Sequence, residues 1–206
     1  PTRLGGIHPP ESLRRQLPIL LACLRGSVCL YQGEELGLDE AELAFEDLHD
    51  PYGIAFWPLF QGRDGARTPM PWRADAPHAG FSEAEPWLPL PATHRTRAVD
   101  RQADEPGSTL EATRRFLHWR RTQPILRAGG WRRYEAVEPL FVFARGTAPE
   151  QLLCGFNLGD ATVVWDGAPP VEPVDAPLPD PAVVTGDGVV FPPHGVLIAR
   201  PLEGGS

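Results

Sequence analysis

The sequence contains no lysine: its 19 basic residues are all arginine, against 27 aspartates and glutamates. This absence points to genomic codon usage rather than to a function, although arginine does supply fork-shaped donors that suit hydroxyl and carboxylate groups. The formal net charge of −8 gives no reason to expect a nucleic acid or an anionic membrane as partner. We therefore expect neither.

Cysteine is scarce, and the spacings that bind metals are missing. The three cysteines, Cys23, Cys29 and Cys154, are odd in number and lie among apolar residues, with no Cys-x-x-Cys pair. This pattern indicates reduced core thiols in a cytoplasmic protein, and it predicts neither a disulfide framework nor a metal site. The sequence also has no glycine-rich phosphate loop, so no cofactor is expected.

A long apolar run is missing as well, and so is the charged start of a secretory signal. The chain begins with Pro1 rather than methionine. We expect neither a signal nor a membrane span within these residues, and we expect the parent protein to begin further upstream.

What the chain does have is enough apolar material for a core. Its 206 residues, 42% of them apolar, can form one large domain or two small ones. Residues 9–25 carry a leucine stripe with helical spacing and end at Gly26, which predicts a helix. Residues 27–31 are apolar without alternation, as in a strand that is buried on both faces. Helix, glycine turn and buried strand together form the repeating unit of a parallel α/β barrel or of an open parallel sheet.

An irregular segment follows between Gly33 and Asp104, rich in proline and in aromatic residues. The aromatic content argues against a disordered tail. We interpret it as an ordered excursion after a barrel strand, where barrels build their sites. A surface flap packed by tryptophan and phenylalanine is the alternative.

The rest of the chain changes character after one more helix. Ser108 and Glu111 fit a capping box, which predicts a helix that runs to about Thr122. Short strands separated by turns are then predicted over residues 140–144, 151–157, 161–165, 188–191 and 196–200. Residues 169–181 are interpreted as a surface connection. We therefore predict a parallel α/β part, followed after Gly129-Gly130 by a small antiparallel sandwich or barrel.

Several motifs occur in an informative order. They include Tyr-Gln-Gly-Glu-Glu-Leu-Gly at residues 31–37, Arg-Asp-Gly-Ala-Arg-Thr-Pro-Met-Pro-Trp at residues 63–72, Val-Asp-Arg-Gln at residues 99–102 and Leu-Leu-Cys-Gly-Phe-Asn-Leu at residues 152–158. In this order and spacing they resemble the α-glucosidases of the α-amylase clan, glycoside hydrolase family 13. The resemblance is greatest to the bacterial oligosaccharide α-glucosidases, and it covers nearly the whole chain. It implies that residues 1–129 form the C-terminal part of a (β/α)8 barrel and that residues 130–206 form an antiparallel β-sandwich, so the fold class is α/β followed by all-β.

The resemblance also implies that the catalytic acids lie outside this sequence. Retaining enzymes use two carboxyl groups about 5–5.5 Å apart. In this family these acids follow the fourth and fifth barrel strands, and a third acid follows the seventh in an Asn-His-Asp triplet. No Asn-His-Asp occurs here, and His49-Asp50 lies in the later loop. We therefore predict no catalytic residue in this chain.

Arg67 is the residue predicted to bind substrate. It resembles the second arginine of the family's Arg-Asp-x-x-Arg-Thr-Pro loop, which an aspartate holds against the hydroxyls of the terminal glucose. Arg63 and Asp64 resemble the residues that stiffen this turn. The alternative is that Arg67 only locks the loop.

Other polar and aromatic residues near the motifs receive structural interpretations. Glu34 and Glu35 are adjacent, and neighbouring side chains of an extended segment point apart, so they cannot flank one glycosidic bond. We expect them to accept structural hydrogen bonds. Tyr31 and Trp72 could stack on sugar rings, but aromatic residues are more often core. Trp87 is left unassigned.

The predicted function is that of a fragment of a retaining α-glucosidase, which in its intact form hydrolyses terminal α-linked glucose from maltose-like or isomaltose-like oligosaccharides. A transglucosylase or a sucrose-acting enzyme of the same clan is the first alternative, because water and sugar hydroxyls compete for one covalent intermediate. A non-catalytic carbohydrate-binding module is the second.

Overall fold

A computed structural model describes residues 3–134 and 136–202, and its chain divides into two compact units. The first contains the residues up to Arg14 together with Leu30–Glu111, and the second contains Arg15–Cys29 and the chain from Ala112 onward. The division therefore falls within the two longest helices, α1 (Glu11–Cys23) and α5 (Thr109–Arg121). This division into compact units is not a domain boundary, so the boundary expected between residues 129 and 130 stays a prediction.

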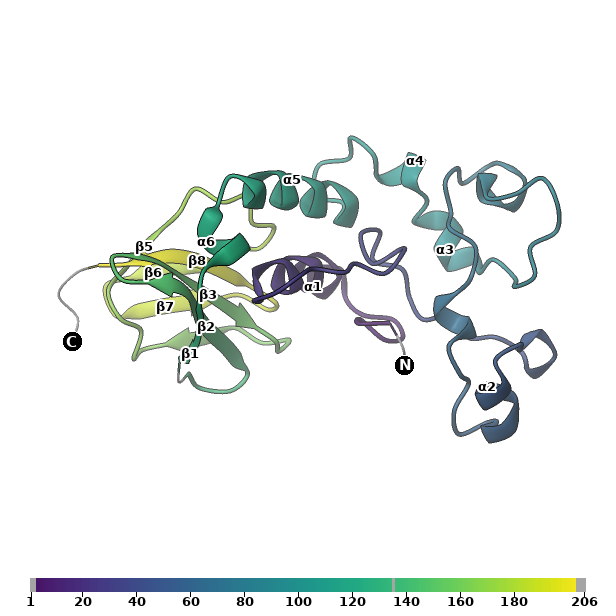
Figure 1. Ribbon diagram of the computed structural model, residues 1–206, viewed down its shortest axis with the longest axis horizontal. Coiled ribbons are helices and arrows are strands. Elements are labelled where there is room, and N and C mark those ends of the chain that lie inside the picture. The colour runs from purple at the N-terminus through teal and green to yellow at the C-terminus, as the bar shows by residue number, and fades with distance from the viewer. Residues whose placement is uncertain (1–2, 135, 203–206) are drawn as a thin grey trace. The chain divides into compact units, whose positions relative to one another are not determined.

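The second unit contains the predicted antiparallel sandwich (Figure 1). One sheet has the strand order β1-β2-β3-β8-β5 and the other has the order β4-β7-β6, with antiparallel pairing between all neighbours. The strands are β1 (Trp131–Tyr134), β2 (Leu140–Thr147), β3 (Glu150–Asn157), β4 (Val163–Trp165), β5 (Val171–Pro173), β6 (Val183–Thr185), β7 (Gly188–Phe191) and β8 (Val196–Pro201).

Five of these strands were predicted and three were not. The missed strands are β1, β5 and β6, which have three or four residues each. Strand β5 lies inside the stretch interpreted as a surface connection, yet it pairs with β8, and Val171 is buried. That interpretation was wrong because the partner of β5 lies far along the chain.

The five-stranded sheet is buried on both faces, and its residues alternate between two cores. Leu153 and Leu197 face the three-stranded sheet, where Trp165 and Phe191 complete the core. The other face packs on α1, α5 and the short helix α6 (Pro124–Ala128). The buried residues of this second core are Ile19, Ala22, Cys23, Phe116, Leu126, Phe143, Leu152, Cys154, Phe156, Val196 and Ile198.

A single buried arginine connects the helices of this core to the sheet. Arg145 on β2 is fully buried and donates to the carbonyl oxygens of Cys23 at 2.6 Å and Leu24 at 2.9 Å, at the end of α1. It also donates to the carbonyls of Gly129 at 3.0 Å and Gly130 at 3.1 Å, just after α6. One guanidinium thus satisfies carbonyls that the ends of two helices leave without donors.

The first unit has little regular structure. Besides the ends of the two long helices it contains α2 (Pro51–Phe56), α3 (Ala92–Thr96), α4 (Val99–Gln102) and the 3-10 turns η1 (Phe45–Asp47), η2 (Asp64–Ala66) and η3 (Pro77–Gly80). The ordered excursion predicted after Gly33 is confirmed. Its small apolar clusters combine residues far apart in sequence, such as Leu43 with Leu88 and Leu36 with Met70.

The strand predicted over residues 27–31 does not form. The segment has no regular structure, and Cys29 is exposed instead of lying in the core. A parallel strand needs hydrogen-bonding partners on its edges, and no described residue supplies them here. Cys23 and Cys154 are buried, as expected.

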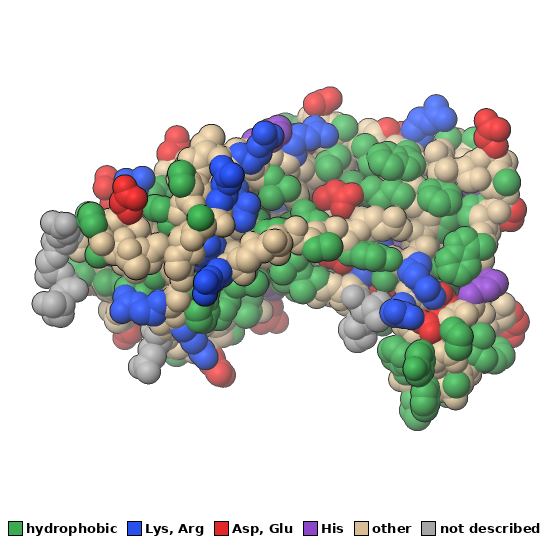
Figure 2. Space-filling view, viewed as in Figure 1, with side chains coloured by type: hydrophobic (Ala, Val, Ile, Leu, Met, Phe, Trp, Pro, Cys, Tyr) green, Lys and Arg blue, Asp and Glu red, His purple; other side chains and the backbone are tan. Residues whose placement is uncertain are grey.

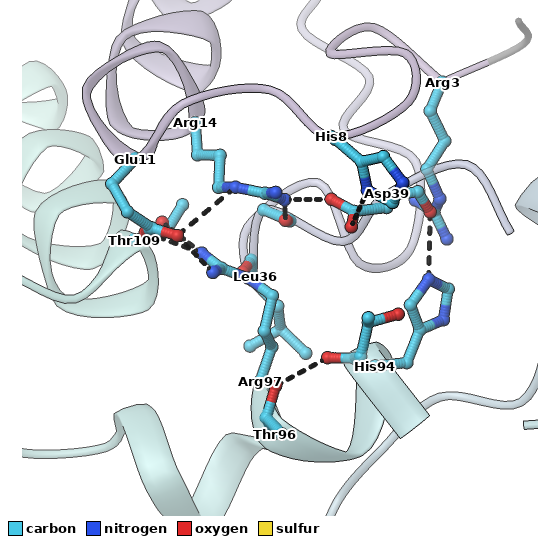
Figure 3. Close-up of polar contacts among 12 residues, drawn as sticks. Arg3, His8, Glu11, Arg14, Leu36, Asp39, His94, Thr96, Arg97 and Thr109 are labelled. Carbon is cyan, nitrogen blue, oxygen red and sulfur yellow. Dashed lines mark hydrogen bonds and ion pairs between the residues drawn. The ribbon is translucent and has the colours of Figure 1, made fainter. Parts of the chain in front are cut away.

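Side-chain hydrogen bonds hold the segment after Gly33 in place (Figure 3). Arg14 donates to the carbonyl of Gly37 and forms an ion pair with Asp39. Arg97 donates to the carbonyl of Leu36 at 3.0 Å and pairs with Glu11 at 2.6 Å. These contacts give an irregular backbone fixed donors in place of a sheet or helix ladder.

His94 extends this network toward the Arg67 loop. It is fully buried, and its Nε2 lies 3.0 Å from the carbonyl oxygen of Asp39 while its Nδ1 lies 3.1 Å from the hydroxyl of Thr68. A carbonyl oxygen can only accept, so Nε2 carries the hydrogen of the neutral ring. Nδ1 then accepts from the hydroxyl of Thr68. Burial, followed by the charge of Arg3, lowers the pKa of His94 from 6.5 to about 4.

We predict that Arg145→Met destabilises the chain by at least about 3 kcal/mol, because several buried carbonyl groups lose their only side-chain donor. Urea unfolding followed by circular dichroism measures the change. Arg133→Met on the exposed strand β1 removes the same charge and should stay within about 0.5 kcal/mol of the parent chain. Equal midpoints for the two variants would show that Arg145 is not needed.

We also predict that stability falls as pH drops from 6.5 to 4. The unfolded chain takes up a proton on His94 in this range and the folded chain does not, so the loss amounts to about 3 kcal/mol and stability is fully present above pH 6.5. His94→Gln cannot titrate and should flatten this dependence, measured by urea unfolding across the range. The exposed His118→Gln serves as control, and an equal flattening there would contradict the assignment.

Candidate functional site

The loop of residues 63–72 is built around a buried carboxylate. Asp64 is fully buried, and its Oδ2 accepts hydrogen bonds from the amides of His49 and Asp50, both at 2.6 Å. Its Oδ1 forms an ion pair with Arg67. Burial alone raises the pKa of Asp64, but these hydrogen bonds outweigh it and bring the pKa below its ordinary value. Asp64 therefore stays charged and holds two segments together.

Asp50 forms the second half of this arrangement. It caps the N-terminus of α2 by accepting from the amide of Tyr52 at 3.1 Å, with Pro51 at the first helical position. Its other oxygen accepts from the amide of Arg63 at 2.9 Å and from its guanidinium at 3.2 Å. The amide of Arg63 is the largest cause of the lowered pKa of Asp50.

Two glycines allow these close approaches. A Cβ at Gly65 would lie 2.5 Å from the carbonyl oxygen of Ala41, whose own amide donates to Gly65. Gly62 has a φ of +71°, and a Cβ there would lie 2.7 Å from that of Asp50. Any other residue at either position would push the two carboxylates out of register with the loop.

Arg67 lies at the surface of this arrangement. Its Nη2 pairs with Asp64 and lies 3.7 Å from Oδ2 of Asp50, and its guanidinium stands 5.5 Å from the centre of the Trp87 ring. His49 meets the same ring edge-on at 5.1 Å. About a third of the Arg67 side chain (32%) is exposed, and its Nε is buried without a hydrogen-bond partner among the described residues. This geometry can present donors to a hydroxyl-rich ligand.

The two structural carboxylates after Gly33 behave as predicted. Glu34 accepts from the amide of Leu4 at 3.4 Å and lies 3.6 Å from Arg3, while Glu35 accepts from the amide of Gly33 at 2.9 Å. Burial is the main cause of a raised pKa for Glu34. Neither residue forms a hydrogen bond or an ion pair with Arg67, Asp64 or Asp50.

Two aromatic residues near the motifs do not lie in a core, contrary to expectation. Tyr31 and Trp72 are about half exposed, at 46% and 50%. A second exposed aromatic set lies around α2, where Tyr52 stacks on Phe56 and Phe45 contacts Trp57.

Sequence reasoning missed three residues of the site. Asp50 carried a signal, because an aspartate before proline at a helix start is a typical N-cap. Trp87 and His94 carried none, since each contacts a residue 20 or more positions away.

The described residues hold no group of three His, Cys, Asp or Glu side chains placed to bind a metal ion. None of the helices in residues 3–134 and 136–202 has both the length and the apolar composition to cross a membrane.

Comparison with known proteins identifies the group to which this chain is related. Residues 2–129, more than half of the chain, match the model of the α-amylase catalytic domain. A probable α-glucosidase of Rhizobium meliloti (strain 1021) is 48% identical over 155 residues, which make up 75% of this chain and 28% of that protein. An oligo-1,6-glucosidase of Heyndrickxia coagulans is 30% identical over 169 residues, or 71% of this chain and 30% of the relative. The chain thus spans about three tenths of these relatives.

Solved structures agree with this result. The α-glucosyl transfer enzyme XgtA is 47% identical and superposes with a TM-score of 0.90 over 98% of this chain and 38% of its own. The trehalulose synthase MutB, at 20% identity and a TM-score of 0.77 over 92% of this chain and 38% of its own, shares the fold. The predicted fold class, part of a barrel followed by a β-sandwich, is confirmed, with no closed barrel among the described residues. The chain belongs to the α-amylase family, glycoside hydrolase family 13.

Proposed function

We propose that this chain is the substrate-holding C-terminal part of a retaining α-glucosidase that removes terminal α-linked glucose from maltose-like or isomaltose-like oligosaccharides. The observation that carries the proposal is the partly exposed side chain of Arg67, whose guanidinium is fixed by ion pairs with Asp64 and Asp50. Relatives named probable α-glucosidase and oligo-1,6-glucosidase support the substrate class. The match to a catalytic domain weighs against a free-standing binding module.

Arg67 would act by hydrogen-bonding hydroxyls of the terminal glucose. The rigid carboxylates behind it remove the cost of ordering the side chain at binding, since its rotamer is already set. A site closed behind one sugar ring would favour cleavage at chain ends. The acids that cleave the bond would come from the rest of the enzyme, because Asp50 and Asp64 each accept three hydrogen bonds that hold the loop together.

Glucosyl transfer is the second candidate. The structure of XgtA, described as an α-glucosyl transfer enzyme, is about as similar in sequence as the relative named probable α-glucosidase. Water and an acceptor hydroxyl would compete for the same glucosyl-enzyme intermediate. Maltose incubated with the full-length enzyme and an alcohol acceptor distinguishes them, because hydrolysis yields two glucose molecules and transfer yields one glucose and one glucoside.

Two further proposals accompany this function. We place the domain boundary of the intact enzyme between residues 129 and 130. We also propose a cytoplasmic location, for which the exposed thiol of Cys29 and the two buried free thiols are the supporting observations.

We predict that the chain of 206 residues does not turn over a chromogenic α-glucoside, because the family's two catalytic carboxyl groups are expected in the part of the enzyme upstream of this chain. The full-length enzyme at equal concentration provides the positive control. Turnover by the isolated chain above that of a mock purification would refute the assignment of the catalytic acids to the rest of the enzyme.

We predict that Arg67→Ala in the full-length enzyme lowers kcat/KM by about ten- to several-hundredfold, since a charge-assisted hydrogen bond contributes ~1.5–3 kcal/mol. The loss should be similar for every α-glucoside, as the terminal glucose is common to all. Arg67→Lys should recover little, because an ammonium cannot reproduce a two-pronged contact.

Arg63→Ala is the matched control, because Arg63 binds the same Asp50 while most of its side chain (64%) faces solvent. It should lower the melting temperature slightly and leave kcat/KM nearly unchanged. If Arg67→Ala instead lowers the melting temperature and the folded enzyme keeps its kcat/KM, Arg67 only braces the loop.

A further inference from the structure

The second unit carries an arginine-rich surface band that the function above does not use. Residues 112–134 contain seven arginines and no aspartate or glutamate, in a chain whose net charge is −8. Figure 2 shows basic side chains gathered over α5, α6 and β1. The arginines are Arg114, Arg115, Arg120, Arg121, Arg127, Arg132 and Arg133.

Some of these arginines have structural partners. Arg120 donates to the carbonyl of Ala22 at 2.6 Å, and Arg132 lies over the ring of Tyr134 at 4.8 Å and donates to its hydroxyl. Arg121 and Arg127 differ, because neither forms a hydrogen bond or an ion pair with any residue that the structure describes. Their charges are therefore not neutralised by the fold.

These two arginines line the same open pocket. The pocket has a volume of about 660 Å³ and is lined by His118, Arg121, Thr122 and Arg127. No carboxylate contributes to its lining. The hydroxyl of Thr122 already donates to the carbonyl of Trp119 at 2.7 Å, so the donors open to a ligand are those of His118, Arg121 and Arg127. Two guanidinium groups without partners in one depression suit a phosphate or carboxylate group.

A second pocket of about 430 Å³ adjoins the first and shares Thr122 with it. Its lining includes Gln123 and Gln151, whose amides can donate to and accept from hydroxyl groups. Glu150 and Arg200 also line it, so its net charge is close to zero. A cationic pocket thus lies next to a neutral pocket whose lining includes two side-chain amides.

We propose that the second unit binds a sugar phosphate at these two pockets. The phosphate monoester occupies the first pocket between Arg121 and Arg127, and the sugar hydroxyls contact Gln123 and Gln151 in the second. A cationic pocket beside a neutral one fits a small ligand with one anionic and one neutral end better than it fits a uniformly charged polymer. This binding is independent of the proposed α-glucosidase activity.

Isothermal titration calorimetry on the chain of 206 residues tests the proposal with glucose 6-phosphate, inorganic phosphate, glucose and a heparin hexasaccharide. We expect glucose 6-phosphate to bind about tenfold more tightly than inorganic phosphate, because hydroxyl–amide hydrogen bonds add to the ionic contact. Glucose alone should give no measurable heat. Inorganic phosphate that binds as tightly as glucose 6-phosphate would overturn the sugar site, and tighter binding of heparin would indicate a polyanion surface instead.

Paired variants locate the site. Arg121→Gln with Arg127→Gln should weaken the binding of both phosphates at least about tenfold. Arg25→Gln with Arg73→Gln changes the net charge equally at exposed positions outside the pockets and should leave affinity unchanged. Equal weakening by both pairs would overturn the site in favour of general electrostatics, and so would the absence of binding to the parent chain.

A third pair separates the two ends of the ligand. Gln123→Ala with Gln151→Ala should bring the affinity for glucose 6-phosphate down to that for inorganic phosphate and leave the latter unchanged. Circular dichroism confirms that each variant is folded. Unchanged affinity for glucose 6-phosphate would remove the amide pocket from the site.

Discussion

Buried backbone carbonyls without a helix or sheet partner are the constraint on which most of this structure depends, and arginine side chains satisfy many of them. Arg3 donates to the carbonyls of Gln32 at 2.9 Å and Ala66 at 3.1 Å, and Arg145 donates to four carbonyls within the second unit. Burial lowers the pKa of both guanidinium groups. The arginine charge survives burial because several donors of one rigid group are used at once.

The candidate site uses the complementary solution, in which buried carboxylates accept from backbone amides. Asp64 and Asp50 each collect amide hydrogen bonds from a neighbouring segment, and both pKa values fall. Two charged acceptors next to each other require a cation, and Arg67 supplies it. The position of Arg67 is therefore set by the internal needs of the loop before any ligand arrives. Such preorganisation is what a sugar-binding side chain requires.

Two kinds of arginine are thus present in one chain. Arg145 and Arg120 donate to backbone carbonyl groups of the fold. Arg67, Arg121 and Arg127 keep N–H groups that donate to no described residue. The residue type alone does not separate the two kinds. A structural arginine differs from a candidate binding residue in how many of its N–H groups already donate within the fold. This count supports the Arg67 site in one unit and the anionic pocket in the other.

The sequence by itself determined the features that depend on local chemistry. The turn signal before it located β7 at its observed bounds, and the capping box located the start of α5, where Ser108 accepts from the amide of Glu111 at 3.1 Å. The ordered motifs located the Arg67 loop and the family. Tertiary structure decided whatever depends on a distant partner. Residues 27–31 have a strand composition but no strand to pair with, whereas the three residues of β5 form a strand because β8 lies beside them. Asp50, Trp87 and His94 join the site through contacts that span 13 to 26 positions, since burial and hydrogen bonding act through space and leave no periodic trace in a sequence.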